Sequence, residues 1–91
     1  MEGLIGIDES WMRFMGEVPS DKNLNELTVP GVYMLTSAFT GKNSPGQNGL
    51  LIVYRAKSSY EYCWQESRSY TTGYIKKRYS NNGCTVWSEW T

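Results

Sequence analysis

The sequence predicts a mainly β fold, a small antiparallel meander of about five to six strands with one short helical turn near residues 23–27. Three observations support this prediction. Tyr, Trp, Val, Ile and Thr are plentiful, whereas alanine occurs only at Ala38 and Ala56, and this balance favours strands over helices. Gly and Pro interrupt the chain at short intervals, as in small β folds. Aromatic residues make up 14% of the chain, which is too many for a disordered polypeptide.

The first residues are weakly patterned, and we expect residues 1–13 to form a tail or the end of a preceding module. A single β domain is then expected over residues 14–91. The segment Trp11–Val18 fits either a short strand or one helical turn.

The helical turn is expected at Asn23–Leu27, because Asn23 and Glu26 have the spacing of a capping box. Leu24 and Leu27 would face inward from it. Pro30 and Gly31 follow. We expect them to end the turn through the fixed φ of proline and a positive φ at glycine, and to direct the next strand.

The rest of the chain alternates between strands and polar connections. In order, we expect a strand at Val32–Ser37, a loop at Phe39–Asn48, strands at Leu50–Tyr54 and Tyr60–Glu66 joined by a turn at Ala56–Ser59, a connection at Ser67–Thr72, a strand at Gly73–Tyr79, a turn at Ser80–Gly83 and a last strand at Thr85–Trp90. Leu50–Tyr54 is the most hydrophobic run and is expected to be the central strand, buried on both faces. The Asn-Gly pair at residues 82–83 is typical of a hairpin turn.

Strand alternation predicts two unlike faces of the sheet. If the Ser67–Thr72 connection is centred between Ser69 and Tyr70, Gln65 lies opposite Tyr74, and Glu61 and Arg78 form a cross-strand pair. The face expected to form the core, because large aromatic side chains bury the most area, collects Tyr60, Tyr62, Trp64, Ile75, Tyr79 and Trp87. The face expected to meet solvent or another subunit collects Glu61, Cys63, Gln65, Tyr74, Lys76, Arg78, Val86, Ser88 and Trp90.

The two cysteines, Cys63 and Cys84, are expected to be free thiols. In the register above they are separated by about 13 Å along the strands and by two strand spacings sideways. A disulfide requires Cα atoms within roughly 7 Å of each other.

The composition excludes several functional classes. The chain has no histidine, and its nine basic and nine acidic residues give no net charge. No phosphate-binding loop, dinucleotide motif or metal-ligand cluster is present, so we expect no enzyme, no cofactor and no metal site. Phosphate neutralisation needs an excess of Lys and Arg, so nucleic acid is not an expected partner. No apolar run approaches the ~20 residues of a membrane span, so no membrane insertion is expected.

Several short motifs occur in a characteristic order. Residues 23–33 read Asn-Leu-Asn-Glu-Leu-Thr-Val-Pro-Gly-Val-Tyr, Gly49 opens the central hydrophobic run, and Gln65, Arg78 and Trp87-Ser88-Glu89-Trp90 close the series. This order, from about Phe14 to Trp90, resembles the knob domain of phage tail fibres and of pyocins, the phage-tail-like bacteriocins. The residues that carry the resemblance as a structural motif are Leu24, Asn25, Leu27, Pro30, Gly31, Tyr33, Gly49, Arg78, Trp87 and Trp90.

The resemblance implies a non-catalytic structural and interaction module of a tail fibre that spaces or presents the host-binding surface. It implies other fibre modules as partners and a homotrimer in the parent protein. It also implies a place in the virion tail after synthesis in the bacterial cytoplasm.

A carbohydrate-binding domain that recognises a bacterial surface polysaccharide is the alternative. Gln65, Tyr74 and Trp90 lie in one row of the expected register, where they could stack on a sugar ring and donate hydrogen bonds to it. The same row could instead seal a subunit interface or pack under the Phe39–Asn48 loop, which is the more common fate of aromatic side chains.

Overall fold

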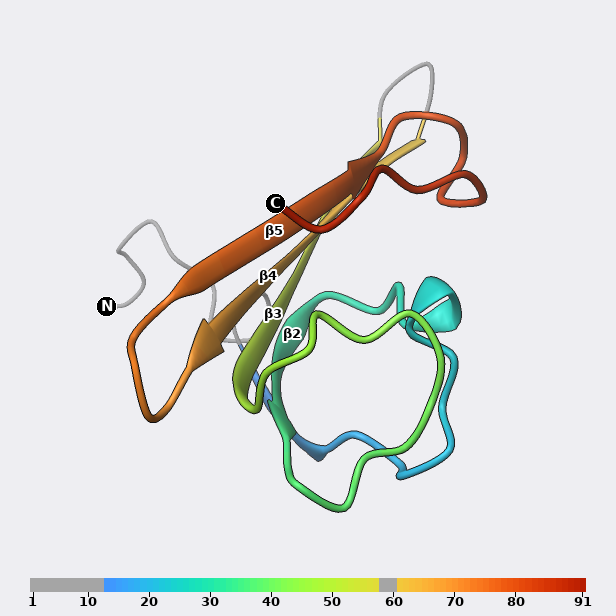
Figure 1. Ribbon diagram of the computed structural model, residues 1–91. Coiled ribbons are helices and arrows are strands. Elements are labelled where there is room, and N and C mark those ends of the chain that lie inside the picture. The colour runs from blue at the N-terminus through green and yellow to red at the C-terminus, as the bar shows by residue number, and fades with distance from the viewer. Residues whose placement is uncertain (1–12, 58–60) are drawn as a thin grey trace, which may run out of the picture.

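A computed structural model describes residues 13–57 and 61–91, and it confirms the mainly β prediction (Figure 1). Five strands form one sheet in the order β1-β2-β3-β4-β5. The elements are β1 (Phe14–Glu17), a single 3-10 turn η2 (Leu24–Glu26), β2 (Gly31–Leu35), β3 (Gly49–Lys57), β4 (Glu61–Ser69) and β5 (Ile75–Ser80). The expected tail at residues 1–13 lies outside the described residues except for Arg13.

The centre of the sheet is β3, as the hydrophobic run at residues 50–54 predicts. It pairs antiparallel with β2 on one side and with the whole length of β4 on the other. Leu51 and Val53 are buried on one face, and Ile52 is only 8% exposed on the other. A continuous apolar run is therefore used where a strand has neighbours on both edges. The prediction that this run is buried on both faces holds for Leu51, Ile52 and Val53 but not for Leu50, which is 38% exposed.

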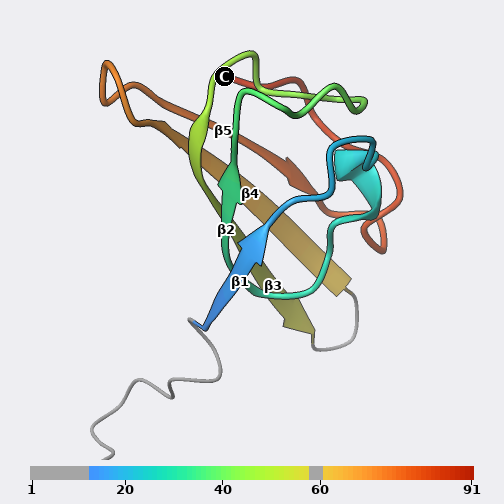
Figure 2. The ribbon, with the colours of Figure 1, turned by 90° about the horizontal axis from the view of Figure 1, so that it is seen from below.

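The first strand differs from the expected antiparallel meander, because β1 pairs parallel with β2. Parallel neighbours cannot be joined by a tight hairpin, since the chain must return to the starting end of the sheet. Residues 18–30 make that return and carry η2 (Figure 2). The sheet is therefore mixed, with β1 on its edge.

The turn and the proline–glycine pair are formed as predicted. Asn23 caps η2, and its Oδ1 accepts a hydrogen bond from the Asn25 amide at 3.0 Å. Gly31 has φ +154°, and a Cβ there would lie 2.9 Å from the Arg13 carbonyl oxygen and would also collide with Met15. Glycine is thus required twice at this position, for its backbone conformation and for the close approach of the β1 segment.

The register of the β4–β5 hairpin differs by four residues from the expected one. Gln65 lies opposite Arg78, because β4 continues through Ser69 and the turn is formed by the residues that follow. The Ser69 Oγ accepts hydrogen bonds from the amides of Thr71 and Thr72, and Gly73 adopts φ +77°. This side-chain turn sets the hairpin further along the chain than a symmetric loop would.

The predicted last strand at Thr85–Trp90 is wrong, since these residues are irregular. Gly83 and Cys84 both have positive φ, so the left-handed pair lies one residue beyond the Asn-Gly position of a hairpin turn. The segment still follows β5 through two backbone hydrogen bonds, from the Ser88 amide to the Tyr79 carbonyl and from the Thr91 amide to the Lys77 carbonyl.

The hydrophobic core lies on one side of the sheet, here called the inner face, under η2 and the loops that flank it (Figures 1 and 2). Its buried members are Val18, Leu24, Leu27, Tyr33, Leu35, Leu51 and Val53, with Phe39 and Trp90 packed against them. These residues come from β2, β3, η2 and the loops, while β4 and β5 add no aliphatic side chain to the cluster.

The burial of the two faces of β4 and β5 is the opposite of the prediction. The inner face is polar yet buried, with Cys63, Gln65, Ser67, Ser69, Arg78 and Ser80 all less than 9% exposed. On the opposite, outer face, Trp64 is 43%, Ile75 48% and Tyr79 52% exposed. Alternation sorts the described residues of β4 and β5 into the correct two sets, but it fails for Trp87, which lies against Arg78 of the inner face. The covering segments lie over the polar set, so the prediction that the aromatic set forms the core is wrong.

Candidate binding surfaces

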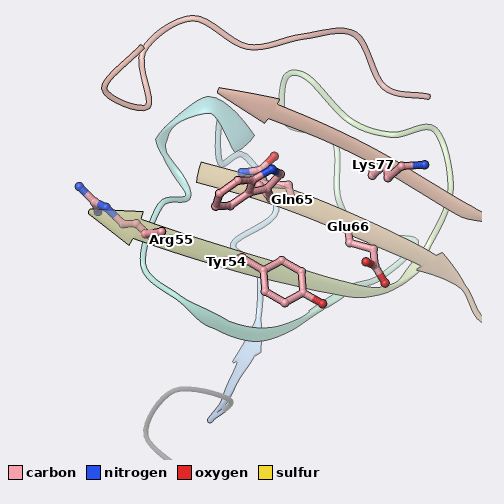
Figure 3. Close-up of a pocket in the computed structure, with 7 residues that line it drawn as sticks. Tyr54, Arg55, Gln65, Glu66 and Lys77 are labelled. Atoms are coloured by element: carbon pink, nitrogen blue, oxygen red, sulfur yellow. The ribbon is translucent and has the colours of Figure 1, made fainter. Parts of the chain in front are cut away.

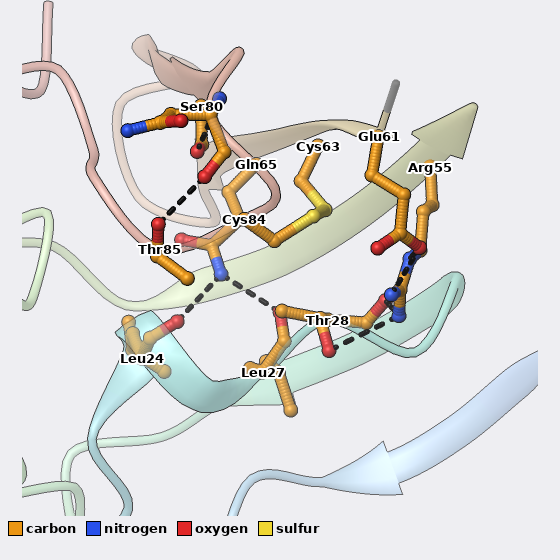
Figure 4. The surroundings of a disulfide bond; sticks show 11 residues. Leu24, Leu27, Thr28, Arg55, Glu61, Cys63, Gln65, Ser80, Cys84 and Thr85 are labelled. Carbon is orange, nitrogen blue, oxygen red and sulfur yellow. Dashed lines mark hydrogen bonds and ion pairs between the residues drawn. A yellow bond between two sulfur atoms is a disulfide. The ribbon is translucent and has the colours of Figure 1, made fainter. Parts of the chain in front are cut away.

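A buried polar network occupies the inner face of β4 and β5. The Gln65 side chain is fully buried, and its Nε2 donates to the carbonyl oxygens of Leu24 at 2.7 Å and Leu27 at 2.9 Å (Figure 4). Its Oε1 accepts a hydrogen bond of 2.8 Å from Arg78 Nε. One glutamine side chain therefore binds the first residue of η2 and its C-cap residue, and connects that turn to β4 and β5.

The Arg78 guanidinium lies between two tryptophan rings. Its central carbon is 4.4 Å from the ring centroid of Trp87 and 4.8 Å from that of Trp90. Burial lowers the pKa of Arg78 to about 10, so the group remains charged at neutral pH and both rings can stabilise it. The irregular backbone of residues 85–90 allows both rings to reach this one side chain, which a regular strand would prevent.

The predicted pair between Glu61 and Arg78 is not formed. Glu61 binds Arg55 instead, with 2.6 Å between Oε2 and Nη2, and Arg55 also donates to the carbonyl and hydroxyl oxygens of Thr28. The shift in register moves Arg78 opposite Gln65, which accounts for the difference.

The prediction of free thiols is also wrong, because Cys63 and Cys84 form a disulfide (Figure 4). Their Cα atoms are 5.6 Å apart, within the normal range for a bridge. Cys63 lies opposite Ser80, and the irregular segment after β5 returns across the inner face to bring Cys84 over it. A straight continuation of the meander would separate the two residues.

The residues of the other motifs have structural roles as well. The Tyr33 hydroxyl donates to the Val29 carbonyl at 2.7 Å, and burial raises the pKa of Tyr33. A Cβ on Gly49 would collide with the carbonyl oxygen of Arg68 on the neighbouring strand. Trp90 donates from Nε1 to the Asn43 carbonyl at 2.9 Å and so binds the loop before β3.

The structure does not bring Gln65, Tyr74 and Trp90 together as a row. Gln65 is buried, and both ends of its amide are engaged. Trp90 packs against the core and the loop at residues 39–48, which was one of the alternatives to sugar stacking. Tyr74 is 69% exposed in the connection between β4 and β5, and Arg78 takes the place opposite Gln65 that the sequence assigned to Tyr74.

The outer face of the sheet carries the aromatic side chains of β4 and β5 that the sequence assigned to the core. Tyr62 and Trp64 lie together with their ring centroids 6.3 Å apart. A hollow of about 460 Å³ runs across β3, β4 and β5 beside Trp64, and Tyr54, Glu66 and Lys77 line it from the three strands (Figure 3). Alternation along β4 and β5 identifies the residues of this face from the sequence. That the face is exposed could be predicted only from the positions of the covering segments.

No chemical site of another kind is found in the described part of the chain. Residues 13–57 and 61–91 hold no group of three His, Cys, Asp or Glu side chains that could bind a metal ion. None of the helices among them is long and apolar enough to cross a membrane.

Comparison with known proteins gives one informative match. No protein-family model and no curated protein matches the sequence. The fold is similar to a solved structure of an N-truncated R2-type pyocin tail fibre, with a TM-score of 0.64 and 28% identity over 85% of this chain. The match spans 31% of that fibre chain. The resemblance inferred from the sequence is therefore confirmed: the chain is similar, in fold and in sequence, to part of a pyocin tail fibre and is consistent with a phage tail-fibre module.

Proposed function

We propose that this chain is a non-catalytic module of a phage tail fibre or a phage-tail-like particle, and that it packs against a neighbouring copy of itself through the outer face of the sheet. By doing so it spaces the fibre or presents the surface that meets the host. The likeness to a pyocin tail fibre supports the setting, and the exposed aromatic face is the observation that carries the mode of action.

The outer face has the character of an interface. Trp64, Ile75 and Tyr79 remain 43–52% exposed although the opposite side of the same strands is tightly covered. Large exposed apolar patches on soluble proteins mark surfaces that other proteins cover, and Trp and Tyr are the residues that contribute most to binding there.

A second copy is the occupant that we favour. The outer face presents both signs of charge beside its rings, since Glu66 and Arg68 form an ion pair of 2.6 Å and Lys77 lies on the next strand. A surface that carries both signs can face a copy of itself without a net repulsion. The chain itself carries no net charge, which also favours association. In a fibre, three such faces that meet around a three-fold axis would form the homotrimer, with different parts of the face in contact across each pair of copies.

Sedimentation equilibrium of the 91-residue chain up to high micromolar concentration tests the proposal. We expect concentration-dependent association with a trimer as the limiting species, strongly weakened in Trp64→Ser. Tyr70→Ser is the matched control, because Tyr70 is 68% exposed but does not line the hollow of this face. A chain that remains monomeric throughout, or equal association of the two variants, would contradict the proposal.

Carbohydrate binding remains the second candidate. Gln65 and Trp90 are engaged inside the protein, so the row first considered is a poor site for it. Tyr74 is the member of that row that remains accessible, and it lies beside a second exposed tyrosine in a polar hollow.

A further inference from the structure

A second hollow, here called the hairpin hollow, lies at the end of the sheet where β3 begins and β4 ends. Its volume is about 460 Å³, within the roughly 300–1,000 Å³ of small-molecule sites. It is lined by Gly46, Gln47, Asn48, Ser69, Tyr70, Thr71, Thr72, Tyr74 and Lys76. It is therefore separate from the hollow of the outer face, with which it shares no lining residue.

The hairpin hollow combines exposed aromatic rings with polar groups. Tyr70 and Tyr74 are 68% and 69% exposed, more than any other large hydrophobic side chain described in residues 13–57 and 61–91. Neither tyrosine hydroxyl donates or accepts a hydrogen bond within that part of the chain. A protein with so small a core gains nothing from leaving two tyrosines in water, because burying each would remove roughly 150–250 Å² from solvent.

The wall around these rings is fixed before any ligand binds. Gln47 Nε2 donates to the Ser67 hydroxyl at 3.0 Å and to the Tyr74 carbonyl at 3.0 Å, which ties the loop before β3 to the hairpin. Lys76 Nζ donates to the Pro45 carbonyl at 3.0 Å and closes the same connection from β5. A wall held in this way loses little conformational entropy on binding.

The chemistry of the lining selects one class of ligand. The only charged side chain is Lys76, which is already bonded to a backbone carbonyl, so an anionic polymer has little to bind. The hydroxyls of the two tyrosines and the side-chain amide of Asn48 can both donate and accept hydrogen bonds. A neutral sugar matches this lining, since its ring has an apolar C–H face for the aromatic rings and hydroxyl groups around its edge.

We propose that the hairpin hollow binds a neutral saccharide, through stacking on Tyr70 and Tyr74 and hydrogen bonds to Asn48. This inference rests on the proposed function in one respect, namely that the module presents a surface to the host envelope. It assigns that surface to the hairpin end of the sheet and leaves the outer face to association between copies.

A nuclear magnetic resonance titration of the full chain tests the inference. The probes are neutral oligosaccharides of glucose, galactose, rhamnose and N-acetylglucosamine, added one at a time to millimolar concentration. We expect at least one probe to shift the backbone amide signals of Asn48, Tyr70 and Thr72. Tyr74→Ala should weaken that binding about tenfold, whereas Tyr79→Ala on the outer face should leave it unchanged.

Two results would overturn the inference: no shift with any probe, or shifts confined to the outer face. A second variant, Tyr70→Ala, tests whether Tyr74→Ala acts only by distorting the hairpin. If both rings stack on the saccharide, the two substitutions should weaken binding to a similar extent. The outcome is independent of the sedimentation result. Loss of saccharide binding in Tyr74→Ala with unchanged association supports this inference, and association without any saccharide binding contradicts it while leaving the proposed packing intact.

Discussion

The two faces of β4 and β5 carry opposite kinds of side chain, and the polar one is inside. On the inner face Gln65, Ser67 and Arg78 are almost completely buried, whereas on the outer face Trp64 and Tyr79 remain about half exposed. Hydrophobicity alone would reverse this arrangement. The inner face is stable because Gln65 binds the carbonyls of Leu24 and Leu27 in the covering segments and Arg78 lies against two tryptophan rings. The outer face remains accessible because the described chain has no segment that crosses it (Figure 1).

If the outer face packs against another copy as proposed, this small module divides its sheet between folding and assembly. A disulfide and the Gln65–Arg78 network attach η2 and the C-terminal segment to one side. The aromatic rings on the other side are then available for another chain. Both features are expected of a module that has to remain folded before and after it joins a larger particle.

The largest expected effect comes from breaking the network on the inner face. Gln65→Ala should lower the free energy of unfolding by about 3–5 kcal/mol, because it removes the side-chain donor to two carbonyls and the acceptor of a buried guanidinium. The Leu24 carbonyl keeps its backbone hydrogen bond from the Leu27 amide. Glu66→Ala, the next residue on the outer face, should change the free energy of unfolding by about 1 kcal/mol or less, since the Arg68 side chain that Glu66 pairs with is 51% exposed to water. Urea unfolding followed by tryptophan fluorescence measures both.

Gln65→Met separates hydrogen bonding from volume, because methionine keeps the size of the side chain and removes its amide. We expect it to be nearly as destabilising as Gln65→Ala. Equal stabilities of the Gln65→Met and wild-type proteins would contradict the view that hydrogen bonds hold the inner face together.

The next effect concerns the disulfide. The bridge closes a loop with a sequence separation of 21, and chain-entropy arguments give such a closure about 3 kcal/mol of stabilisation. Cys63→Ser combined with Cys84→Ser should therefore lower the free energy of unfolding by about that amount. Thiol counting on the denatured, unreduced wild-type protein is the companion measurement, and two reactive thiols per chain would disprove the bridge.

The smallest effect compares a tyrosine from each face. Tyr33→Phe should cost about 0.5–1.5 kcal/mol at neutral pH, because the Val29 carbonyl loses its donor. Tyr79→Phe should cost nothing measurable, since Tyr79 is 52% exposed on the outer face. Thermal unfolding of the two variants beside the wild-type protein gives the comparison.

The pH dependence of stability gives a further test of the Tyr33 hydrogen bond. Burial raises the pKa of Tyr33 above its ordinary value of 10.0, so the folded protein keeps the proton after the unfolded chain has released it. The stabilising contribution of Tyr33 is therefore complete below pH 10 and is lost as the pH rises through the folded value. The difference between the wild-type and Tyr33→Phe proteins should shrink in that range, and a constant difference would contradict the assignment.

Much of the fold and little of the candidate sites could be predicted from local sequence. The capped turn, the proline–glycine pair and the central strand at residues 50–54 depend on neighbouring residues, and the structure confirms them. Three features that depend on distant segments were predicted wrongly. The sequence predicted an antiparallel meander where β1 pairs parallel, a β4–β5 register four residues away from the observed one, and free thiols in place of the disulfide. The hairpin hollow was missed for the same reason, because the residues before β3 and those after β4 meet only in space.

For β4 and β5 the sequence by itself determined which residues share a face, because alternation along a strand follows from backbone geometry and is insensitive to a register shift of four. It did not do so for Trp87 and Trp90, which lie in no strand and both contact Arg78. It also determined the order of motifs that points to a tail fibre. Only the tertiary structure decided which of the two faces is buried. That choice depends on where η2 and the C-terminal segment lie, and on whether Gln65 and Arg78 find enough partners there to offset the cost of leaving water.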